Sequence, residues 1–188
     1  LILLSLVLLS AGIFGWENWS QNRLSNLQDS ADMYESFINS LNDDDLDQQV
    51  LANQIIKKYP NTLYADLVTF HLAKISVEQE DLIQAEKHLE WILKRRDSRW
   101  GSDFDPIEAT ARLRLARVLI ANDNSNKALE IINDSKNMNS SLHEAKGDAE
   151  ENLGLYSEAK LSYLKALESN QSQSVEAILK MKLANLDT

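Results

Sequence analysis

Residues 142–169 read LHEAKGDAEENLGLYSEAKLSYLKALES, and this stretch decides the fold. Gly147 lies in its first half, Gly154 lies near its middle, and small or aromatic residues recur on one helical face of the second half, at Ala159, Tyr163 and Ala166. Small residues on facing positions let two helices pack closely, and a glycine between helical segments is typical of a turn. The stretch therefore predicts a helix, a turn and a second helix packed on the first.

The same frame recurs twice upstream. A separation of 12 residues joins Ala73 to Ala85, Ala116 to Ala128 and Gly147 to Ala159. Repeated helix pairs with small residues at these positions are typical of the tetratricopeptide repeat. The longer step between the first two copies fits an inserted loop over residues 97–106, where Gly, Pro, Ser and Asp occur together. We predict an all-α, tetratricopeptide-like solenoid.

Further helices flank the three pairs. Tyr59-Pro60 predicts the end of a helix over residues 46–58, because proline cannot continue a helix. Before it, an apolar stripe predicts a helix whose core face is formed by Leu24, Leu27, Ala31, Tyr34, Ile38 and Leu41. After the repeats, a last amphipathic helix with Val175, Ile178, Leu179, Leu183 and Leu186 would cover the open end of the stack. The solenoid thus has about three to four pairs and a C-terminal capping helix.

The first 15 residues, LILLSLVLLSAGIFG, carry no charge, and ten of them are Leu, Ile, Val or Phe. Trp16 and Trp19 follow at once, as at a membrane–water interface. We predict a transmembrane anchor over residues 1–19; the first residue is Leu1 rather than Met, and we expect the span to begin upstream. Two alternatives are a cleaved signal peptide, with Ser10 and Gly12 at the cleavage site, and a buried core helix.

The charge pattern favours one orientation and excludes some classes of function. Residues 16–56 contain a single basic residue, Arg23, so the positive-inside rule places this flank outside the cytoplasm. The chain has 29 acidic and 19 basic residues, a net charge of −10, without a basic cluster. This balance argues against nucleic-acid binding, which needs grouped Lys and Arg. The predicted domains are the anchor over 1–19 and a repeat domain over 20–188.

No catalytic, cofactor or metal site is predicted. Cysteine is absent, and the three histidines, His71, His88 and His143, fall on different predicted helices without a partner at metal-ligand spacing. The sequence contains neither a glycine-rich phosphate loop nor a nucleophile elbow. We expect no cofactor, and an interaction protein rather than an enzyme.

Recognition by stacked helix pairs uses the concave groove lined by the first helices. In the repeat frame the groove-facing positions are Phe70, Lys74, Val77, Leu113, Arg117, Ile120, Glu144, Asp148 and Glu151. The groove is predicted to be apolar and basic at its start and acidic at its end. This mixture suits an extended peptide or a partner helix. Each residue has an alternative role in packing or on the solvated surface.

Three short motifs together resemble the YfgM family, the ancillary subunits of the bacterial SecYEG translocon. They are Gly15-Trp16-Glu17-Asn18-Trp19, Leu113-Arg114-Leu115-Ala116-Arg117-Val118 and Met181-Lys182-Leu183-Ala184-Asn185-Leu186. The resemblance implies a single-pass protein of the bacterial inner membrane with a periplasmic tetratricopeptide domain. It also implies partnership with SecYEG, with the periplasmic chaperone PpiD and with exported client proteins. The family offers no catalytic or ligand motif to transfer.

The sequence is also compatible with two other functions. A different cell-envelope tetratricopeptide scaffold, such as a coordinator of cell division or outer-membrane assembly, would share the fold; those relatives are typically soluble or lipidated. A holdase chaperone for exported clients would need exposed apolar surface in the groove. The leading prediction is a membrane-tethered interaction subunit that links the translocon to periplasmic chaperones and assists the trafficking of exported proteins.

Overall fold

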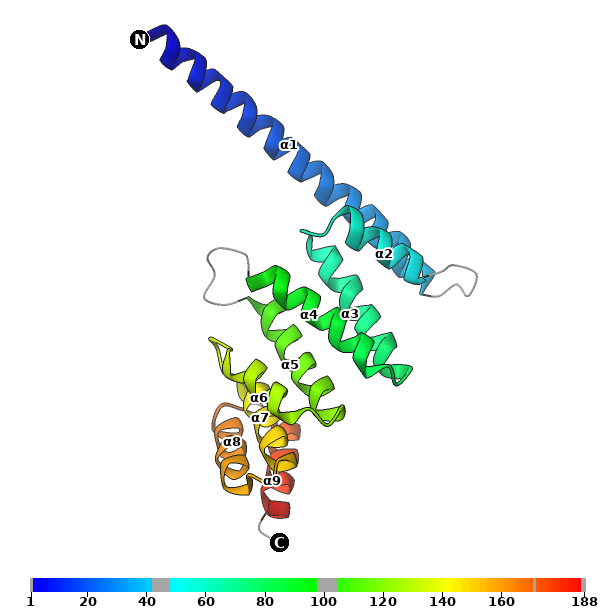
Figure 1. Cartoon of the computed structure of the whole chain (residues 1–188), viewed down its shortest axis with the longest axis vertical. Coiled ribbons are helices and arrows are strands. Elements are labelled where there is room, and N and C mark those ends of the chain that lie inside the picture. The colour runs from blue at the N-terminus through cyan, green and yellow to red at the C-terminus, as the bar shows by residue number, and fades with distance from the viewer. Residues whose placement is uncertain (1, 42–47, 98–104, 171, 187–188) are drawn as a thin grey trace. The chain divides into compact units, whose positions relative to one another are not determined.

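The computed structural model describes residues 2–41, 48–97, 105–170 and 172–186, with side chains from Trp16 onward except Asn18. The described residues form helices and no strands (Figure 1). The helices are α1 (Ile2–Ser40), α2 (Gln48–Lys58), α3 (Leu63–Glu78), α4 (Leu82–Asp97), α5 (Pro106–Ala121), α6 (Ser125–Asn133), α7 (Ser140–Asn152), α8 (Tyr156–Glu168) and α9 (Gln173–Leu186). The chain divides into two compact units, residues 1–69 and 70–188. The prediction of an all-α fold is confirmed for the described part.

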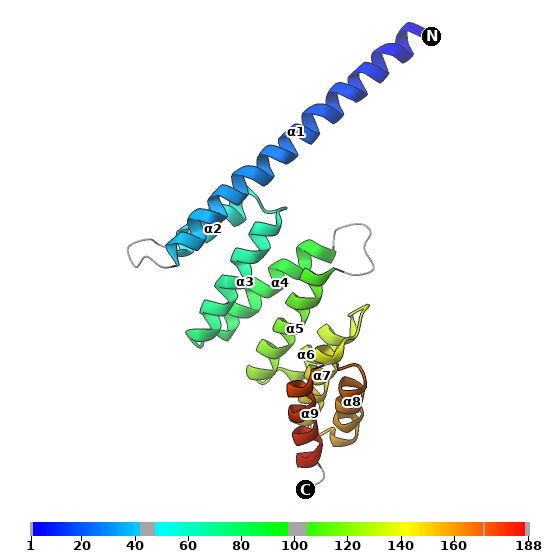
Figure 2. The same ribbon diagram turned by 180° about the vertical axis from the view of Figure 1, so that it is seen from behind.

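In the first unit, α2 lies along the C-terminal part of α1 (Figures 1 and 2). Ile55 and Phe37 are fully buried, and the rings of Tyr34 and Tyr64 lie 5.2 Å apart. The Tyr59 hydroxyl donates to Asp29 across 3.3 Å. The helix α2 ends at Lys58, as the Tyr59-Pro60 step predicts.

The predicted core stripe of α1 is wrong at Leu24, Leu27 and Ile38, which are exposed; Leu24 is 64% exposed. The buried positions lie on a neighbouring face, at Ser30, Phe37 and Ser40. Each of these serines donates its hydroxyl to the carbonyl three residues earlier, so a polar side chain is buried at little cost. A stripe defined by apolar residues alone missed this face.

Among the described residues no helix is both long and apolar enough to cross a membrane. The predicted anchor over residues 1–19 depends on the side chains of residues 1–15, which lie outside the described side chains.

In the second unit, consecutive helices pack on one another from α4 to α9, and α5 also contacts α7 (Figure 1). The first helices of the second and third pairs, α5 and α7, thus lie side by side, as in a tetratricopeptide stack. The small residues that define the predicted frame are buried: Ala73, Ala85, Ala116, Ala128, Gly147 and Ala159. The contacts confirm the predicted pairs α5–α6 and α7–α8, and the shared buried cluster of Ala73, Ala85 and Leu89 supports the pair α3–α4.

The turn inside each pair has one conformation. Its central residue has a positive φ: 61° at Glu80, 56° at Asp123 and 74° at Gly154. The next residue donates its N–H back to a carbonyl of the first helix, in the bonds Asp81 to Ser76 (2.8 Å), Asn124 to Leu119 (2.8 Å) and Leu155 to Glu150 (2.9 Å). This is the Schellman arrangement that satisfies the last carbonyls of a helix. Only the third copy uses glycine for the left-handed residue among these three turns.

The remaining predicted elements have mixed outcomes. Of the inserted loop, residues 98–104 lie outside the described part, whereas Asp105 caps α5 by accepting from the N–H of Ile107 at 2.9 Å, and Pro106 begins the helix. In the terminal helix α9, Leu179 is fully buried beside Tyr163 and Ala166 in one cluster. Ile178 is exposed, so the predicted apolar face of α9 is wrong at that position.

Candidate partner-binding site

A cavity of about 340 Å³ opens between α3, α4 and α5. Its lining comes from four residues of α3, two of α4 and four of α5: Phe70, Ala73, Lys74, Val77, Leu82, Leu89, Arg114, Arg117, Val118 and Ala121. On α3 and α5 these residues follow spacings of three and four, so each helix presents one face to the cavity. The floor is apolar, and all three charged side chains of the lining are cationic.

The cations sit around the apolar floor in different ways. The Arg114 guanidinium carbon lies 4.6 Å from the centroid of the Phe70 ring, which is a cation–π distance. Lys74 Nζ lies 3.4 Å from Glu78 Oε1, and both side chains are more than half exposed. Arg117 lies 3.8 Å from Glu144 Oε2 on α7. The exposed Lys74–Glu78 pair contributes little, and the Arg117 side chain is itself 54% exposed, so both cations remain accessible to a partner.

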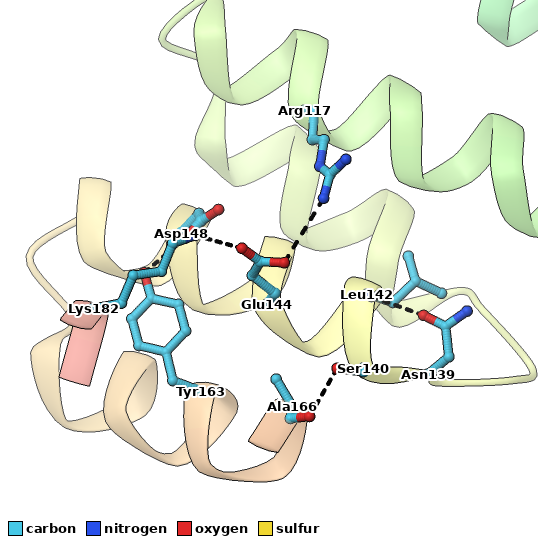
Figure 3. A network of polar contacts seen from close by, with 9 residues as sticks. All are labelled: Arg117, Asn139, Ser140, Leu142, Glu144, Asp148, Tyr163, Ala166 and Lys182. Atoms are coloured by element: carbon cyan, nitrogen blue, oxygen red, sulfur yellow. Dashed lines mark hydrogen bonds and ion pairs between the residues drawn. The ribbon is translucent and has the colours of Figure 1, made fainter. Parts of the chain in front are cut away.

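The acidic end of the predicted groove is a closed network of polar contacts (Figure 3). Lys182 of α9 lies 2.9 Å from Glu144 Oε1 and 2.6 Å from Asp148 Oδ1. The Tyr163 hydroxyl of α8 lies 2.8 Å from Asp148 Oδ1 and 2.6 Å from Glu151 Oε2, and shares its single proton between them. The three carboxylates are therefore held by the chain's own groups.

The pKa values follow from these contacts. Burial and then the hydrogen bonds to the Glu151 and Asp148 carboxylates raise the pKa of the Tyr163 hydroxyl. Burial lowers the pKa of Lys182, but the hydrogen bonds to Asp148 and Glu144 outweigh it and leave the pKa raised. Lys182 is consequently charged, and Tyr163 protonated, at neutral pH.

Close packing holds this network in place. A Cβ on Gly147 would overlap the Tyr163 ring, so glycine allows the ring to pack this closely against α7. At the start of α7, Asn139 accepts from the N–H of Leu142 at 3.0 Å, and Ser140 donates to the Ala166 carbonyl at 2.8 Å (Figure 3). The N-cap and the bond to α8 fix the direction of the helix that carries Glu144 and Asp148.

The predicted groove residues separate into three groups. Four line the cavity: Phe70, Lys74, Val77 and Arg117. Leu113 and Ile120 are partly buried and pack against the core. Glu144, Asp148 and Glu151 belong to the polar network.

Sequence reasoning missed Arg114, Leu82 and Leu89 as lining residues. The repeat frame aligns Phe70 with Leu113 rather than with its neighbour Arg114, so it gave no reason to select the arginine. The spacing of Arg114, Arg117, Val118 and Ala121 along one face of α5 was the available signal.

Among the described residues, no group of three or more His, Asp or Glu side chains is arranged to hold a metal ion. Burial is the main cause of a lowered pKa at His71, His88 and His143 alike. These histidines belong to α3, α4 and α7, as their separate positions in the sequence predict.

The family model of the tetratricopeptide repeat-like domain matches residues 1–188. The chain belongs to this family. It is 29% identical over 187 residues to an ancillary SecYEG translocon subunit of Aggregatibacter actinomycetemcomitans, covering 98% of this chain and 88% of the relative. It is 27% identical, with the same coverage, to an ancillary SecYEG translocon subunit of Haemophilus influenzae. No solved structure matches the chain significantly.

These relatives confirm the YfgM-family assignment that the three short motifs predict. The tetratricopeptide family is of a scaffold type, whose members act by protein–protein contact. A cavity with an apolar floor and cationic edges, carried on such a scaffold, is suited to holding a segment of another protein.

Proposed function

We propose that this chain is a membrane-anchored interaction subunit of the SecYEG translocon that binds partner proteins through the α3–α5 cavity. The observation that carries the proposal is the apolar cavity with exposed cations on a tetratricopeptide scaffold. The names of the relatives support the association with SecYEG. The cavity lining contains no Ser, Thr, Tyr, His, Asp or Glu, so we expect it to bind a partner without catalysing a reaction.

The proposed anchor comprises residues 1–19, with residues 20–188 as the periplasmic repeat domain. The uncharged apolar run of residues 1–15 and the tryptophans after it support the anchor. Trp16 and Trp19 are exposed, their ring centroids lie 5.3 Å apart, and Arg23 lies 5.6 Å from the Trp19 ring centroid. Such an amphipathic cluster suits the interface between hydrocarbon and water.

Anchoring in the membrane would allow a small cavity with low affinity to hold a partner. An anchor in the inner membrane raises the effective concentration of the repeat domain near the translocon exit, so that weak contacts are enough. We propose SecYEG, the periplasmic chaperone PpiD and exported clients as partners; the last two rest on the YfgM-family resemblance. The domain would hold the chaperone beside the translocon while exported chains emerge.

Site-specific photo-crosslinking in whole cells tests this function. A photoreactive residue at Val77, which is 43% exposed in the cavity lining, should form adducts with translocon or chaperone subunits. The matched control is Leu161 on α8, an apolar residue that is 60% exposed and lies outside the lining. Equal adducts at both positions, or none from Val77, would show that the cavity is not the docking face.

A holdase for unfolded clients is the second candidate, because the cavity floor exposes apolar surface. A cavity of about 340 Å³ accommodates a few side chains, whereas holdases use larger apolar surfaces, so selective docking is favoured. Light scattering of an aggregating client separates the two functions. Suppression of scattering at equimolar protein would favour the holdase.

A further inference from the structure

The charge of the α3–α5 cavity specifies the chemistry of its partner. We infer that the cavity binds an acidic segment of a partner protein that inserts one large apolar side chain. The inference rests on the proposed function and narrows the class of segment that the cavity accepts.

The apolar part of the cavity has the size of an anchor pocket. Phe70, Leu89 and Val118 are buried, Val77 is partly exposed, and the open cavity that they line has a volume of about 340 Å³. This lies at the lower end of the volumes of ligand pockets, roughly 300–1,000 Å³. One aromatic or branched side chain with its neighbouring backbone would fill it, as anchor residues do in peptide recognition.

The charged side chains that line the cavity are opposite in sign to the net charge of the protein. The chain has 29 acidic and 19 basic residues, yet the lining contains Lys74, Arg114 and Arg117 and no Asp or Glu. A local reversal of sign attracts and orients an anionic partner, and disfavours a cationic one. Cations from both α3 and α5 line the cavity, so carboxylates beside the apolar anchor would complement them.

The three cationic side chains can still accept a carboxylate from a partner. Among the described residues no carboxylate lies within ion-pair distance of Arg114, whose recorded contact is with the Phe70 ring. Lys74 is 66% exposed despite its pair with Glu78, and Arg117 is 54% exposed despite its long contact with Glu144. A partner carboxylate can add to these exposed groups without breaking a buried ion pair.

The neighbouring acidic residues of α7 are less accessible to a basic segment than the cations are to an acidic one. The acidic residues of α7 that face this side are already in contact with Lys182, Tyr163 and, for Glu144, Arg117. Recruiting them would require displacing Lys182, which hydrogen-bonds two carboxylates at once. The acidic class of partner is consequently favoured over the basic class.

Fluorescence anisotropy of labelled peptides on the full chain in detergent tests the inference. One peptide carries a Phe flanked on both sides by Glu; a second has Lys in place of Glu, and a third has Ala in place of Phe. The Glu-flanked Phe peptide should bind, and the other two peptides should bind at least about tenfold more weakly. Added salt should weaken binding of the Glu-flanked Phe peptide, because salt screens the attraction between charges.

Variants of the chain complete the test. Arg114→Gln should weaken binding of the Glu-flanked Phe peptide by about fivefold, because an exposed ion pair is lost. Arg114→Glu should weaken its binding by about tenfold, because the new carboxylate also repels the peptide. Lys136→Glu, which makes the same change of charge at an exposed residue between α6 and α7, should change binding by less than about twofold. Circular dichroism checks that each variant is folded.

The outcomes separate this inference from the proposed function. Equal binding of the Glu- and Lys-flanked peptides would overturn the acidic specificity and leave the cavity as a general docking site. Failure of the Glu-flanked peptide to bind would also overturn it, whereas the proposed function is judged independently by the Val77 adducts in cells.

Discussion

The α3–α5 region and the α7–α9 region share one repeat frame but use their exposed faces differently. In the first, Phe70 and Val77 leave an open cavity with cations at its edge. In the second, Lys182 and Tyr163 occupy the acidic face that the repeat frame would leave to a partner. The difference teaches that a charged face of a repeat is a binding surface only where the neighbouring repeat or capping helix leaves it unused.

The helix pairs also differ in which side chains fill the space between their two helices. Equivalent positions of the second helices hold Leu89, Ile132 and Tyr163, all buried. The matching positions of the first helices hold Ala73, Ala116 and Gly147. The largest of these side chains, Tyr163, belongs to the same pair as the smallest residue, Gly147. The reason is that the total volume between two packed helices is nearly constant.

Breaking the close packing of the last pair should have the largest effect. Gly147→Val places side-chain atoms where the Tyr163 ring lies, and should lower the free energy of unfolding by about 3 kcal/mol. Chemical denaturation measures the change. Combining it with Tyr163→Leu should cost less than the sum of the two single changes, since the smaller residue removes the clash. Additive costs would contradict the contact.

Removing one hydroxyl from the network should have a smaller effect. Tyr163→Phe deletes the donor that Asp148 and Glu151 share, and should lower stability by about 1.5 kcal/mol. Tyr156→Phe, at an exposed tyrosine of α8, is the matched control and should change stability by less than about 0.5 kcal/mol. Similar losses from both variants, measured by urea denaturation, would exclude a special role for the buried hydroxyl.

Removing the ion pairs between α9 and the carboxylates of α7 should lower the free energy of unfolding by a somewhat smaller amount. Lys182→Met leaves Glu144 and Asp148 without their cation, and should lower stability by about 1 kcal/mol. Lys180→Met, which removes the exposed pair with Glu176, should cost about 0.3–0.5 kcal/mol.

The pH dependence of the Lys182→Met effect identifies its origin. The folded-state pKa of Lys182 lies above the ordinary value of 10.5, so its stabilisation is complete at neutral pH. It should disappear as the pH rises beyond about 10.5 through the folded-state pKa. Denaturation series of the unchanged chain and the variant, at neutral and alkaline pH, measure the difference; a constant gap would indicate lost packing instead of lost charge.

The open region should tolerate change with the smallest effect on stability. Val77→Ser replaces a half-exposed residue of the cavity lining, and should change the free energy of unfolding by less than about 0.5 kcal/mol. The same variant should weaken binding of the Glu-flanked Phe peptide, measured by anisotropy. A large loss of stability would show that the cavity wall is part of the core.

Local pattern predicted most of the second unit and less of the first. The small residues at Ala73, Ala116 and Gly147 were sufficient to locate three pairs, since close helix contact excludes larger side chains there. On α1, apolar periodicity selected Leu24 and Ile38, but the buried face includes Ser30 and Ser40. A serine that bonds its own helix is compatible with burial, and a count of apolar residues does not register it.

The site was predictable only in part. Phe70, Lys74, Val77 and Arg117 were found because they recur at helical spacing on the first helices. Arg114 was not predicted, because its place at the cavity depends on a contact with Phe70, which lies on another helix.

The amino-acid sequence by itself determined the helix pairs, their turns and the family, because periodicity, small residues and turn chemistry act over a few neighbouring residues. Tertiary structure alone decided which face stays open. Lys182 reaches Glu144 and Asp148 across 38 and 34 residues of sequence, and such a contact depends on how the last helix packs. Charge along a chain shows which groups are present; only packing determines which of them remain free for a partner.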